Sequence, residues 1–440
     1  MERIIPPTRS LRGRMRVPGD KSVTHRGLIF GTLAQGESTL RYPLKAGDTL
    51  STAAVMRQLG GQISEQGEHF HIKGAGLRLQ EPGDILDCGN AGTLIRLVAG
   101  LLSGQNLFTV LTGDASLKRR PMGRVTTPLR QMGARIEGRE GGKLAPLAIR
   151  GGGLTGIHYE MPVASAQVKS SVLLAGLFAD EDTEVMEPAP TRDHTERVLR
   201  HYGLPVEVEQ LGLPGTSGRS RVEGRLIRTR RADPFAARDL TVPGDISSAA
   251  FFIVAALITP ESDVTLEGVG LNPTRTGLLT VLKEMGADLS WEVTEGHDGE
   301  PVGWIRARTS DLRGVSVDPG LIPLMVDEVP VLAAAAAWAE GETYIPNLEE
   351  LRVKESDRVA AVAKNLHNLG VPVEVGPDWL RIRGGNVQGG GLVEPFHDHR
   401  IAMAFAVCGL QKGVTVSDAE WASISFPSFW EDLERLTARG

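Results

Sequence analysis

The sequence predicts an α/β protein in which one unit of strand, helix, strand, helix and strands is repeated six times. Three observations predict it. Residue types that favour helix N-caps recur about every 75 residues ahead of apolar stretches with helical spacing, and glycines that can end a helix recur in phase with them. The tetrapeptide VPGD also occurs twice, at residues 17–20 and 242–245.

The first helix of each repeat is predicted to begin at a residue whose short polar side chain accepts hydrogen bonds from the free N–H groups of the first turn. Each such residue precedes an apolar stretch and then a strand-like one, as AGTLIRLVAGLL and LFTVLTG follow Asn90. The six predicted caps are Asp20, Asn90, Ser165, Asp245, Asp327 and Asp398.

The second helix of each repeat is predicted to end at a glycine, which adopts the left-handed conformation without a Cβ penalty. These glycines lie 38 to 43 residues after the caps, and a short strand-like stretch such as ARIEG follows each. They are Gly60, Gly133, Gly203, Gly286 and Gly370.

The sixth repeat lacks its final strands, whereas residues 4–16 precede any predicted helix and can supply one. VPGD then marks the start of each half of the chain. We therefore predict an N-terminal domain of three repeats over residues 16–241. The C-terminal domain of three repeats takes residues 242–440 plus 1–15 and is completed by the N-terminal strand.

Composition excludes several classes of protein. A hydrophobic content of 41% is ordinary for a globular chain, and no apolar run reaches the roughly 18 residues that span a bilayer. The net charge of −6 argues against generic nucleic-acid binding, and the first residues do not resemble a signal peptide. Cys88 and Cys408 lie in apolar contexts, which predicts core thiols and fits a reduced cytoplasm.

Basic side chains gather at the predicted helix starts, where they are unfavourable unless an anion binds there. At the first helices we find Lys21, Ser22 and Arg26; Asn90, Gly92, Thr93 and Arg96; Ser165 and Gln167; Asp327 and Glu328; and Asp398, His399 and Arg400. At the second helices we find Lys118, Arg119 and Arg120; Arg192; and Lys354, Glu355 and Arg358. Several such helix ends indicate a phosphate or carboxylate ligand.

The two VPGD copies separate folding from chemistry. Lys21 follows the first copy and Ile246 the second, so the repeat can be built without the lysine. Two alternatives concern the other charged motifs: RVKESDR could be a solvated face with an i,i+4 pair, and HDHR could bind a metal through His397 and His399. No third ligand cluster supports the metal, so neither a metal nor a cofactor is expected.

Six motifs, in order over the whole chain, resemble the 5-enolpyruvylshikimate-3-phosphate synthase family: GDKSVTHR, GNAGTLIR, RRPMGR, SAQVKSS, RVKESDR and DHRIAM. The resemblance implies an inside-out α/β barrel of two similar domains, each with three βαβαββ repeats. It also implies transfer of the enolpyruvyl group of phosphoenolpyruvate to the 5-hydroxyl of shikimate 3-phosphate, releasing phosphate, in the pathway to chorismate and aromatic amino acids. The family default is a cytoplasmic monomer.

The same resemblance assigns roles to residues. Asp327 matches the base that deprotonates the 5-hydroxyl, Glu355 the acid that protonates the methylene carbon, and Lys21 a cation that touches both substrates. Shikimate 3-phosphate would contact Lys21, Ser22, Arg26, Ser165, Ala166, Gln167, Arg192, Asp327 and Lys354. Phosphoenolpyruvate would contact Lys21, Gly92, Arg120, Gln167, Arg358 and Arg400, and Asn90 and Thr93 of the same GNAGT stretch are expected to bind substrate. Because these residues come from both halves, the halves are expected to close on the ligand.

Two departures resemble the divergent bacterial branch of the family. Ile424 stands where many members have a lysine, and Ala166 where many have a second serine. The inhibitor glyphosate competes with phosphoenolpyruvate in the family, and resistant members of this branch often carry alanine at the position of Gly92. The glycine here therefore predicts inhibition.

Two rival functions are weighed against this one. The sister enzyme that acts on UDP-N-acetylglucosamine usually has asparagine after the first lysine and a cysteine in a mobile loop, whereas this chain has Ser22 and no cysteine near Arg120. A non-catalytic repeat protein that binds anions would avoid carboxylates among its cations, yet Asp327 and Glu355 lie there.

Overall fold

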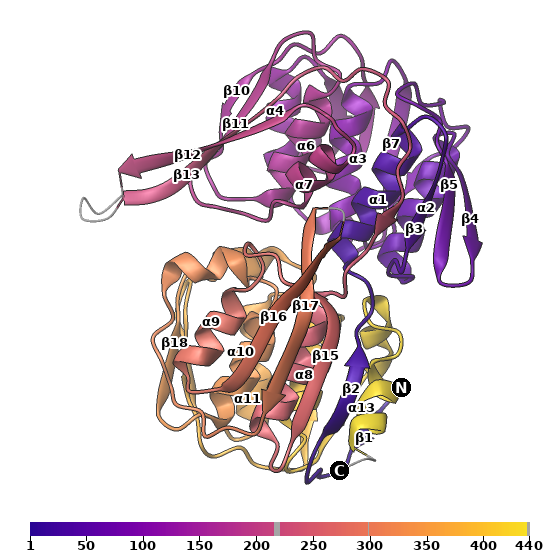
Figure 1. The fold of residues 1–440 in the computed structure, drawn as a ribbon. Helices are drawn as coiled ribbons and strands as arrows, with labels where there is room; N and C mark the ends of the chain where they lie inside the picture. The colour runs from indigo at the N-terminus through magenta and orange to yellow at the C-terminus, as the bar shows by residue number, and fades with distance from the viewer. Residues whose placement is uncertain (215–220, 298, 438–440) are drawn as a thin grey trace. The chain divides into compact units, whose positions relative to one another are not determined.

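The computed structural model describes residues 1–214, 221–297 and 299–437, and these form two compact units. Unit 2 consists of residues 19–242 and 297–300, and unit 1 of residues 1–18, 243–296 and 301–440. Each unit is a mixed α/β structure with three small sheets and is described by itself (Figure 1). The described strands form six separate small sheets and not one closed barrel.

Unit 2 contains three repeats. Its helices are α1 (Lys21–Leu33), α2 (Gly47–Gln58), α3 (Gly92–Ser103), η1 (Leu117–Arg119), α4 (Gly123–Gln131), α5 (Arg139–Gly142), α6 (Ala166–Gly176) and α7 (His194–His201). Its strands are β3 (Glu37–Arg41), β4 (Gln62–Gln66), β5 (His69–Lys73), β6 (Leu86–Asp87), β7 (Phe108–Thr112), β8 (Arg135–Gly138), β9 (Leu144–Arg150), β10 (His158–Glu160), β11 (Thr183–Glu187), β12 (Val206–Pro214), β13 (Arg221–Thr229) and β14 (Leu240–Thr241).

Unit 1 contains the other three. Its helices are α8 (Ile246–Ile258), α9 (Gly277–Glu284), η2 (Pro319–Leu324), α10 (Val329–Trp338), η3 (Glu349–Val353), α11 (Arg358–Asn368), α12 (His399–Cys408), η4 (Ala419–Ile424) and α13 (Phe429–Thr437). Its strands are β1 (Arg3–Ile5), β2 (Arg12–Arg16), β15 (Asp263–Gly270), β16 (Asp288–His297), β17 (Glu300–Arg308), β18 (Glu342–Ile345), β19 (Val373–Val375), β20 (Leu380–Arg383), β21 (Gly391–Val393) and β22 (Val414–Val416).

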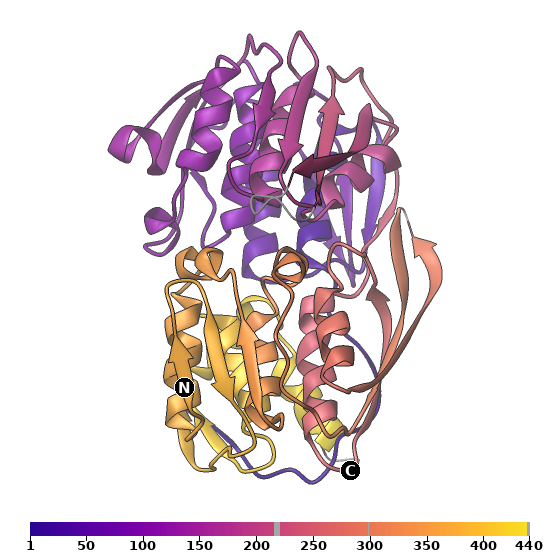
Figure 2. The same cartoon turned by 90° about the vertical axis from the view of Figure 1, so that its left-hand side faces the viewer.

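All six sheets follow one plan. The strand after each first helix, namely β3, β7, β11, β15, β18 or β22, pairs antiparallel with one neighbour. In five sheets that neighbour is the second strand of a hairpin, and in the sixth it is β1. Figure 2 accordingly shows the N-terminus among C-terminal elements of unit 1. The expectation of six copies of one unit is confirmed.

The strand that precedes each VPGD segment pairs inside the unit that the chain leaves at that segment. β2 comes before the first VPGD but pairs in parallel with β15 of unit 1, while β14 comes before the second VPGD and pairs in parallel with β3 of unit 2. The chain therefore passes from one unit to the other at each VPGD, at Pro18–Gly19 and at Val242–Pro243.

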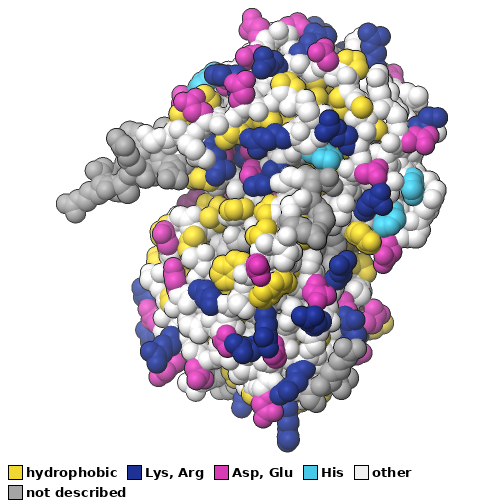
Figure 3. Space-filling view, viewed as in Figure 1, with side chains coloured by type: hydrophobic (Ala, Val, Ile, Leu, Met, Phe, Trp, Pro, Cys, Tyr) yellow, Lys and Arg dark blue, Asp and Glu magenta, His cyan; other side chains and the backbone are white. Residues whose placement is uncertain are grey.

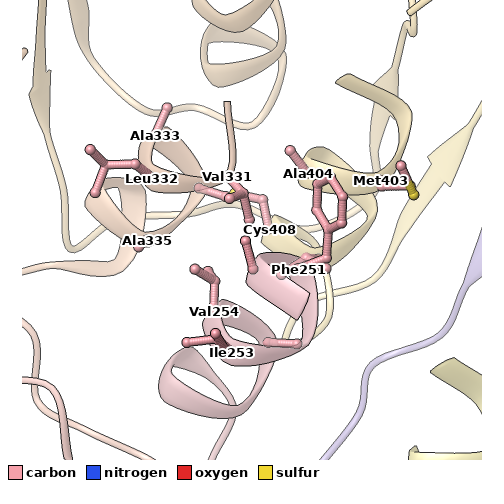
Figure 4. Packing of buried hydrophobic residues seen from close by; sticks show 14 of the residues in the cluster. Phe251, Ile253, Val254, Val331, Leu332, Ala333, Ala335, Met403, Ala404 and Cys408 are labelled. Carbon is pink, nitrogen blue, oxygen red and sulfur yellow. The ribbon is translucent and has the colours of Figure 1, made fainter. Parts of the chain in front are cut away.

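The first helices form the core of each unit. In unit 1, α8, α10 and α12 contact one another, and every residue of α8 is buried. Figure 4 shows Phe251 and Val254 of α8 close to Val331 of α10 and Cys408 of α12. A helix that is apolar on all sides must be buried in this way. Cys88 and Cys408 are free and buried, as the sequence predicts.

The helix boundaries test the predicted caps and stops. Asp20, Ser165, Asp245 and Asp398 are N-caps whose side chains accept a first-turn N–H, and all five predicted glycines have positive φ, between 72° and 105°. The other two predicted caps are wrong. The caps of α3 and α10 are Ala91 and Glu328, and neither uses its side chain. In the described part of the chain, every helix is too short or too polar to cross a membrane.

Candidate functional site

Lys21 is the first residue of α1 and lies beside the start of α2. Its Nζ is 3.1 Å from Oδ2 of Asp48, and its side chain is 15% exposed. Asp20 caps the same helix by accepting from the backbone N–H of Val23 at 2.9 Å. The lysine thus adds a cation to a helix end that already favours anions.

Arg26, one turn further along α1, is buried and joins three helices. Its Nε donates to Oγ1 of Thr195 on α7 at 2.7 Å, and its Nη2 donates to Oγ of Ser170 on α6 at 2.9 Å. Burial lowers the pKa of Arg26 to about 10, and the nearby Glu196 opposes this shift. The side chain therefore stays cationic at neutral pH.

Two guanidinium groups lie at the start of α3. Nη1 of Arg96 donates to Oε1 of Gln167 at 2.8 Å, and Nη2 of Arg120 donates to Oδ1 of Asn90 at 2.5 Å. Nδ2 of Asn90 also donates to Oδ2 of Asp114 at 2.6 Å. Both ends of the Asn90 amide are thus engaged, and the cap position of α3 is held by Ala91.

Gly92 lets these guanidinium groups come close to the backbone. A Cβ at this position would lie 2.8 Å from Nη1 of Arg96 and 2.9 Å from Nη1 of Arg120. Neighbouring Thr93 accepts from Nε2 of Gln167 at 3.0 Å, so the starts of α3 and α6 are joined. Any side chain at position 92 would displace one of the two arginines.

The start of α6 carries Ser165, Ala166 and Gln167. Ser165 caps the helix by accepting from the backbone N–H of Val168 at 3.4 Å. Arg192 lies in the segment between β11 and α7 and is half-buried. Ser22 is the second residue of α1. Unit 2 thus brings together the N-terminal ends of α1, α3 and α6.

In unit 1, Arg358 is the centre of a network of carboxylates. Its guanidinium lies 2.9 Å from Oδ1 of Asp327, 2.6 Å from Oε2 of Glu355 and 2.8 Å from Oδ2 of Asp398, and its side chain is 1% exposed. Burial alone would lower the pKa of Arg358, but the three carboxylates raise it above its usual range. Asp327 and Glu355 are thereby held on one cation.

Two further cations approach Asp327. Nζ of Lys354 lies 3.9 Å from Oδ1, and Nη2 of Arg400 lies 3.9 Å from Oδ2. Arg400 also donates to the backbone carbonyl of Asp327 at 3.2 Å. Asp327 lies one residue before Glu328, the cap of α10, and its carboxylate pairs with arginine and lysine.

The two structural alternatives for these motifs are not supported. α11 begins only at Arg358 and is capped by Asp357, so Lys354 and Glu355 precede the helix and form no i,i+4 face with it. His399 is buried in the first turn of α12, and His397 packs on Trp421. Among the residues that the structure describes, no group of three His, Cys, Asp or Glu side chains could hold a metal.

A surface hollow elsewhere in unit 1 offers a useful contrast. It has a volume of about 800 Å³, lies over β2, β15 and β17, and is lined by several arginines. Arg14 pairs with Glu267 and Arg306 with Asp263. Figure 3 shows Lys and Arg interspersed with Asp and Glu over the visible face of this unit. Exposed pairs of this kind contribute little to stability.

Sequence reasoning missed the residues that hold the predicted site residues in place. Asp48, which pairs with Lys21, and Glu328, which lies 3.8 Å from Arg400, were given no role. Lys169 belongs to the SAQVKSS motif, yet it was not singled out as the one charged residue of α6. That isolated charge was the available signal. Ile424 ends η4 and is half-buried.

The chain was compared with known families and proteins. The family model described as EPSP synthase (3-phosphoshikimate 1-carboxyvinyltransferase) matches residues 5–433. The chain belongs to the EPSP synthase family. A curated relative from Thermus thermophilus, named 3-phosphoshikimate 1-carboxyvinyltransferase, is 68% identical over 99% of this chain and 98% of its own. One of the same name from Synechococcus is 51% identical over 98% of this chain and 96% of its own.

Solved structures agree with the fold. An EPSP synthase from Acinetobacter baumannii is 42% identical, with a TM-score of 0.85, over 99% of this chain and 98% of that one. The enolpyruvyl transferase NikO from Streptomyces tendae shares the fold at 18% identity, with a TM-score of 0.75, over 99% of this chain and 96% of that one. The family that the six motifs indicate is confirmed. These matches favour it over the sister enzyme that acts on UDP-N-acetylglucosamine and over a non-catalytic anion-binding protein.

Proposed function

We propose that the charged clusters of unit 2 and unit 1 are the two parts of the machinery that performs the reaction of the EPSP synthase family. That reaction transfers the enolpyruvyl group of phosphoenolpyruvate to the 5-hydroxyl of shikimate 3-phosphate and releases phosphate. As a member of the family, the chain is a 3-phosphoshikimate 1-carboxyvinyltransferase of the shikimate pathway.

The pair of carboxylates on Arg358 is the observation that carries the proposal. Addition and elimination through a tetrahedral intermediate need one group to take a proton and another to give one. Asp327 accepts the proton of the 5-hydroxyl as its oxygen attacks C2 of phosphoenolpyruvate, and Glu355 protonates the methylene carbon. The intermediate then returns a proton from its new methyl group to Glu355 as the double bond re-forms, and phosphate leaves with the proton held by Asp327. Their contacts with Arg358, at 2.9 and 2.6 Å, support this pairing.

The cations have an electrostatic role in the proposal. Both substrates are anions, and arginines preorganised in a water-poor site stabilise developing charge better than water does. Lys21, Arg120, Arg358 and Arg400 face phosphoenolpyruvate, with Gly92 and Gln167 beside it, and Asn90 orients Arg120.

Shikimate 3-phosphate is assigned to the remaining polar groups. Ser165, Ala166 and Gln167 offer a capped helix start to its phosphate, and Arg192 adds a cation. Ser22 and Arg26 of unit 2, and Lys354 with Asp327 of unit 1, complete the set. Thr93 supports Gln167 through their hydrogen bond.

A phosphate-release assay with both substrates tests the function. We expect release only when shikimate 3-phosphate and phosphoenolpyruvate are present together, with enolpyruvylshikimate 3-phosphate as the coupled product. Release with UDP-N-acetylglucosamine in place of shikimate 3-phosphate, or none with either acceptor, would contradict the assignment.

We further propose that the protein acts as a monomer in the cytoplasm, without cofactor or metal. Two free, buried thiols suit a reducing compartment, and burial raises the pKa of Cys408 to about 12. Light scattering of the purified chain should give the mass of one 47.2 kDa chain. A mass of two chains at assay concentration would overturn this part.

A further inference from the structure

Three charged side chains of unit 2 are almost fully buried against one another. Nζ of Lys169 on α6 lies 3.1 Å from Oε2 of Glu187 at the end of β11, and 2.7 Å from Oε1 of Glu196 on α7. Their side chains are 0%, 0% and 1% exposed. The two carboxylates raise the pKa of Lys169 although burial opposes them, so the lysine is charged.

This triad connects two segments that the proposed function assigns to shikimate 3-phosphate. Lys169 lies one turn after Ser165, Ala166 and Gln167 on α6. Glu187 accepts from the backbone N–H of Thr191 at 3.3 Å and from its hydroxyl at 2.7 Å. Thr191 directly precedes Arg192. The lysine therefore links the start of α6 to the segment that carries Arg192.

The triad also adjoins Arg26. Ser170 directly follows Lys169, and Thr195 directly precedes Glu196. Both accept hydrogen bonds from the Arg26 guanidinium. Their hydroxyl groups are hydrogen-bonded to each other at 2.7 Å. Two buried cations, Lys169 and Arg26, are thus balanced by two buried carboxylates, and the four charges join α1, α6, α7 and the end of β11.

The repeat itself does not require this lysine. In the three other first helices that have a side-chain cap, the residue four positions after the cap is Thr24, Ala249 or Ala402, and all three are fully buried. A buried charged group is costly, and well-packed apolar side chains are often at least as stable. A charge at this one repeat therefore needs a reason other than folding of the repeat.

We propose that Lys169 is a positioning residue that, with Glu187 and Glu196, aligns the start of α6, Arg192 and Arg26 for shikimate 3-phosphate. The inference rests on the proposed function, which assigns those groups to that substrate. A misplacement of substrate-binding groups by the order of 1 Å can lower the rate by about 10²-fold. In this proposal the triad affects the substrate by holding those groups in place and does not contact the substrate itself. Phosphoenolpyruvate, assigned mainly to other groups, depends on the triad less.

The test is steady-state kinetics of Lys169→Met with each substrate varied in turn. We expect KM for shikimate 3-phosphate to rise at least about tenfold, and KM for phosphoenolpyruvate to change less than about threefold, because of the aligned groups only Gln167 is also assigned to phosphoenolpyruvate. Ile149→Ala, at a buried position of β9 in the neighbouring repeat, is the control for loss of stability alone. It should lower Tm without changing either KM. Equal changes in both constants of Lys169→Met, or none, would overturn the inference.

A second variant separates alignment from stability. Lys169→Met/Glu196→Gln removes one charge of each sign, so Tm should recover in part while KM for shikimate 3-phosphate stays raised. A KM that returns to the wild-type value together with Tm would show a structural role only. If Lys169→Met is insoluble, Glu196→Gln alone should raise this KM about threefold or more, and an unchanged value would overturn the inference.

Arg192→Ala, measured in the same series, distinguishes failure of the positioning role from failure of the proposed substrate site. If it raises KM for shikimate 3-phosphate while Lys169→Met does not, the positioning role fails and the proposed site stands. If Arg192→Ala also leaves that KM unchanged, the assignment of this substrate to α6 and Arg192 fails, and the inference fails with it.

Discussion

The starts of α1 and α8 follow the same tetrapeptide and differ in what they present. Asp20 and Asp245 both cap their helices, accepting from a backbone N–H at 2.9 Å. The next residue is Lys21 in α1, beside Asp48, and Ile246 in α8, which is 2% exposed. The same capped helix start therefore occurs twice, with a charged side chain in α1 and an apolar one in α8.

The contrast extends along both helices. Four and five residues after Lys21, α1 carries His25 and Arg26, whereas α8 carries Ala250 and Phe251 at the matching positions. Ser247 of α8 is buried and hydrogen-bonded to Glu328 and Arg275, so it is used inside unit 1. Lys21 and Arg26, to which the proposed function assigns substrate contacts, are thus replaced by apolar residues in the second copy.

The largest effect is expected for Lys21→Met. Loss of a cation that contacts both anionic substrates should lower turnover by about 10³-fold or more. The lost pair with Asp48, whose side chains are 15% and 10% exposed, should cost about 1–2 kcal/mol, a shift in Tm of about 4 °C or less. Lys45→Met, which removes another lysine of unit 2 that pairs with Glu65, is the matched control and should keep full turnover. A core-like drop in Tm of Lys21→Met would give Lys21 a structural role.

Asp327→Asn should lower turnover by about 10²–10⁴-fold, as loss of a general base implies. Binding of shikimate 3-phosphate, measured by calorimetry, should stay within about tenfold, because the amide oxygen can still accept from Arg358. Asp318→Asn, which changes only the cap of η2, serves as the control. Turnover close to the wild-type value would assign the base to another residue.

Ile246→Lys reverses the comparison by placing a charge at the apolar start. Burying an ammonium group without a built partner should destabilise unit 1 by on the order of 3 kcal/mol. Ile246→Met, which nearly conserves volume, should cost less than about 1.5 kcal/mol. Urea unfolding measures both. If the lysine variant is as stable as the methionine variant, the α8 start tolerates charge, and its apolar residue carries no information.

His25 gives α1 a dependence on pH that α8, with Ala250, lacks. Burial lowers the pKa of His25 to about 3, below the roughly 6.5 of an unfolded chain. Between these values the unfolded chain binds the extra proton, so stability is lost as pH falls below about 6.5. The loss from pH 7.5 to pH 5 should be about 2 kcal/mol. His25→Gln, compared by urea unfolding at both pH values, should lose less than the wild type by that amount, and an identical loss would contradict the buried neutral state.

Gly92→Ala is expected to have the smallest effect. Glyphosate should inhibit in competition with phosphoenolpyruvate, and the added methyl group, at 2.8 to 2.9 Å from two guanidinium ends, should weaken the inhibitor roughly tenfold more than the substrate. The inhibition constant and the KM for phosphoenolpyruvate, measured for both proteins, decide this. Equal losses would show that position 92 does not discriminate.

The sequence predicts the repeat well because its signals are local. A cap such as Ser165 and a stop such as Gly133 act within one helix turn, so their residue types suffice. Asn90 and Asp327 each lie one residue before the observed cap of their helix, and their side chains pair with Arg120 and Arg358. Local pattern cannot distinguish a cap from such a partner.

The supporting residues are harder to predict than the site residues. Lys169 and its partner Glu196 lie on different helices, and only the fold brings them together. The pairing of β2 with β15 and of β14 with β3 is of the same kind, since it joins residues 200 or more positions apart in the chain. Residues that resemble a family motif can be assigned from the sequence, whereas the groups that orient them require coordinates.

The most direct test of the central claim is to measure turnover and unfolding for Lys21→Met and Ile246→Lys side by side. The claim is that α1 and α8 share the same capped helix start, and that the lysine at the start of α1 serves the reaction and not the fold. We predict a crossed pattern, in which the first variant loses turnover and keeps its stability, and the second loses stability. If Lys21→Met were to lose stability as Ile246→Lys does, or to keep its turnover, the claim would be contradicted.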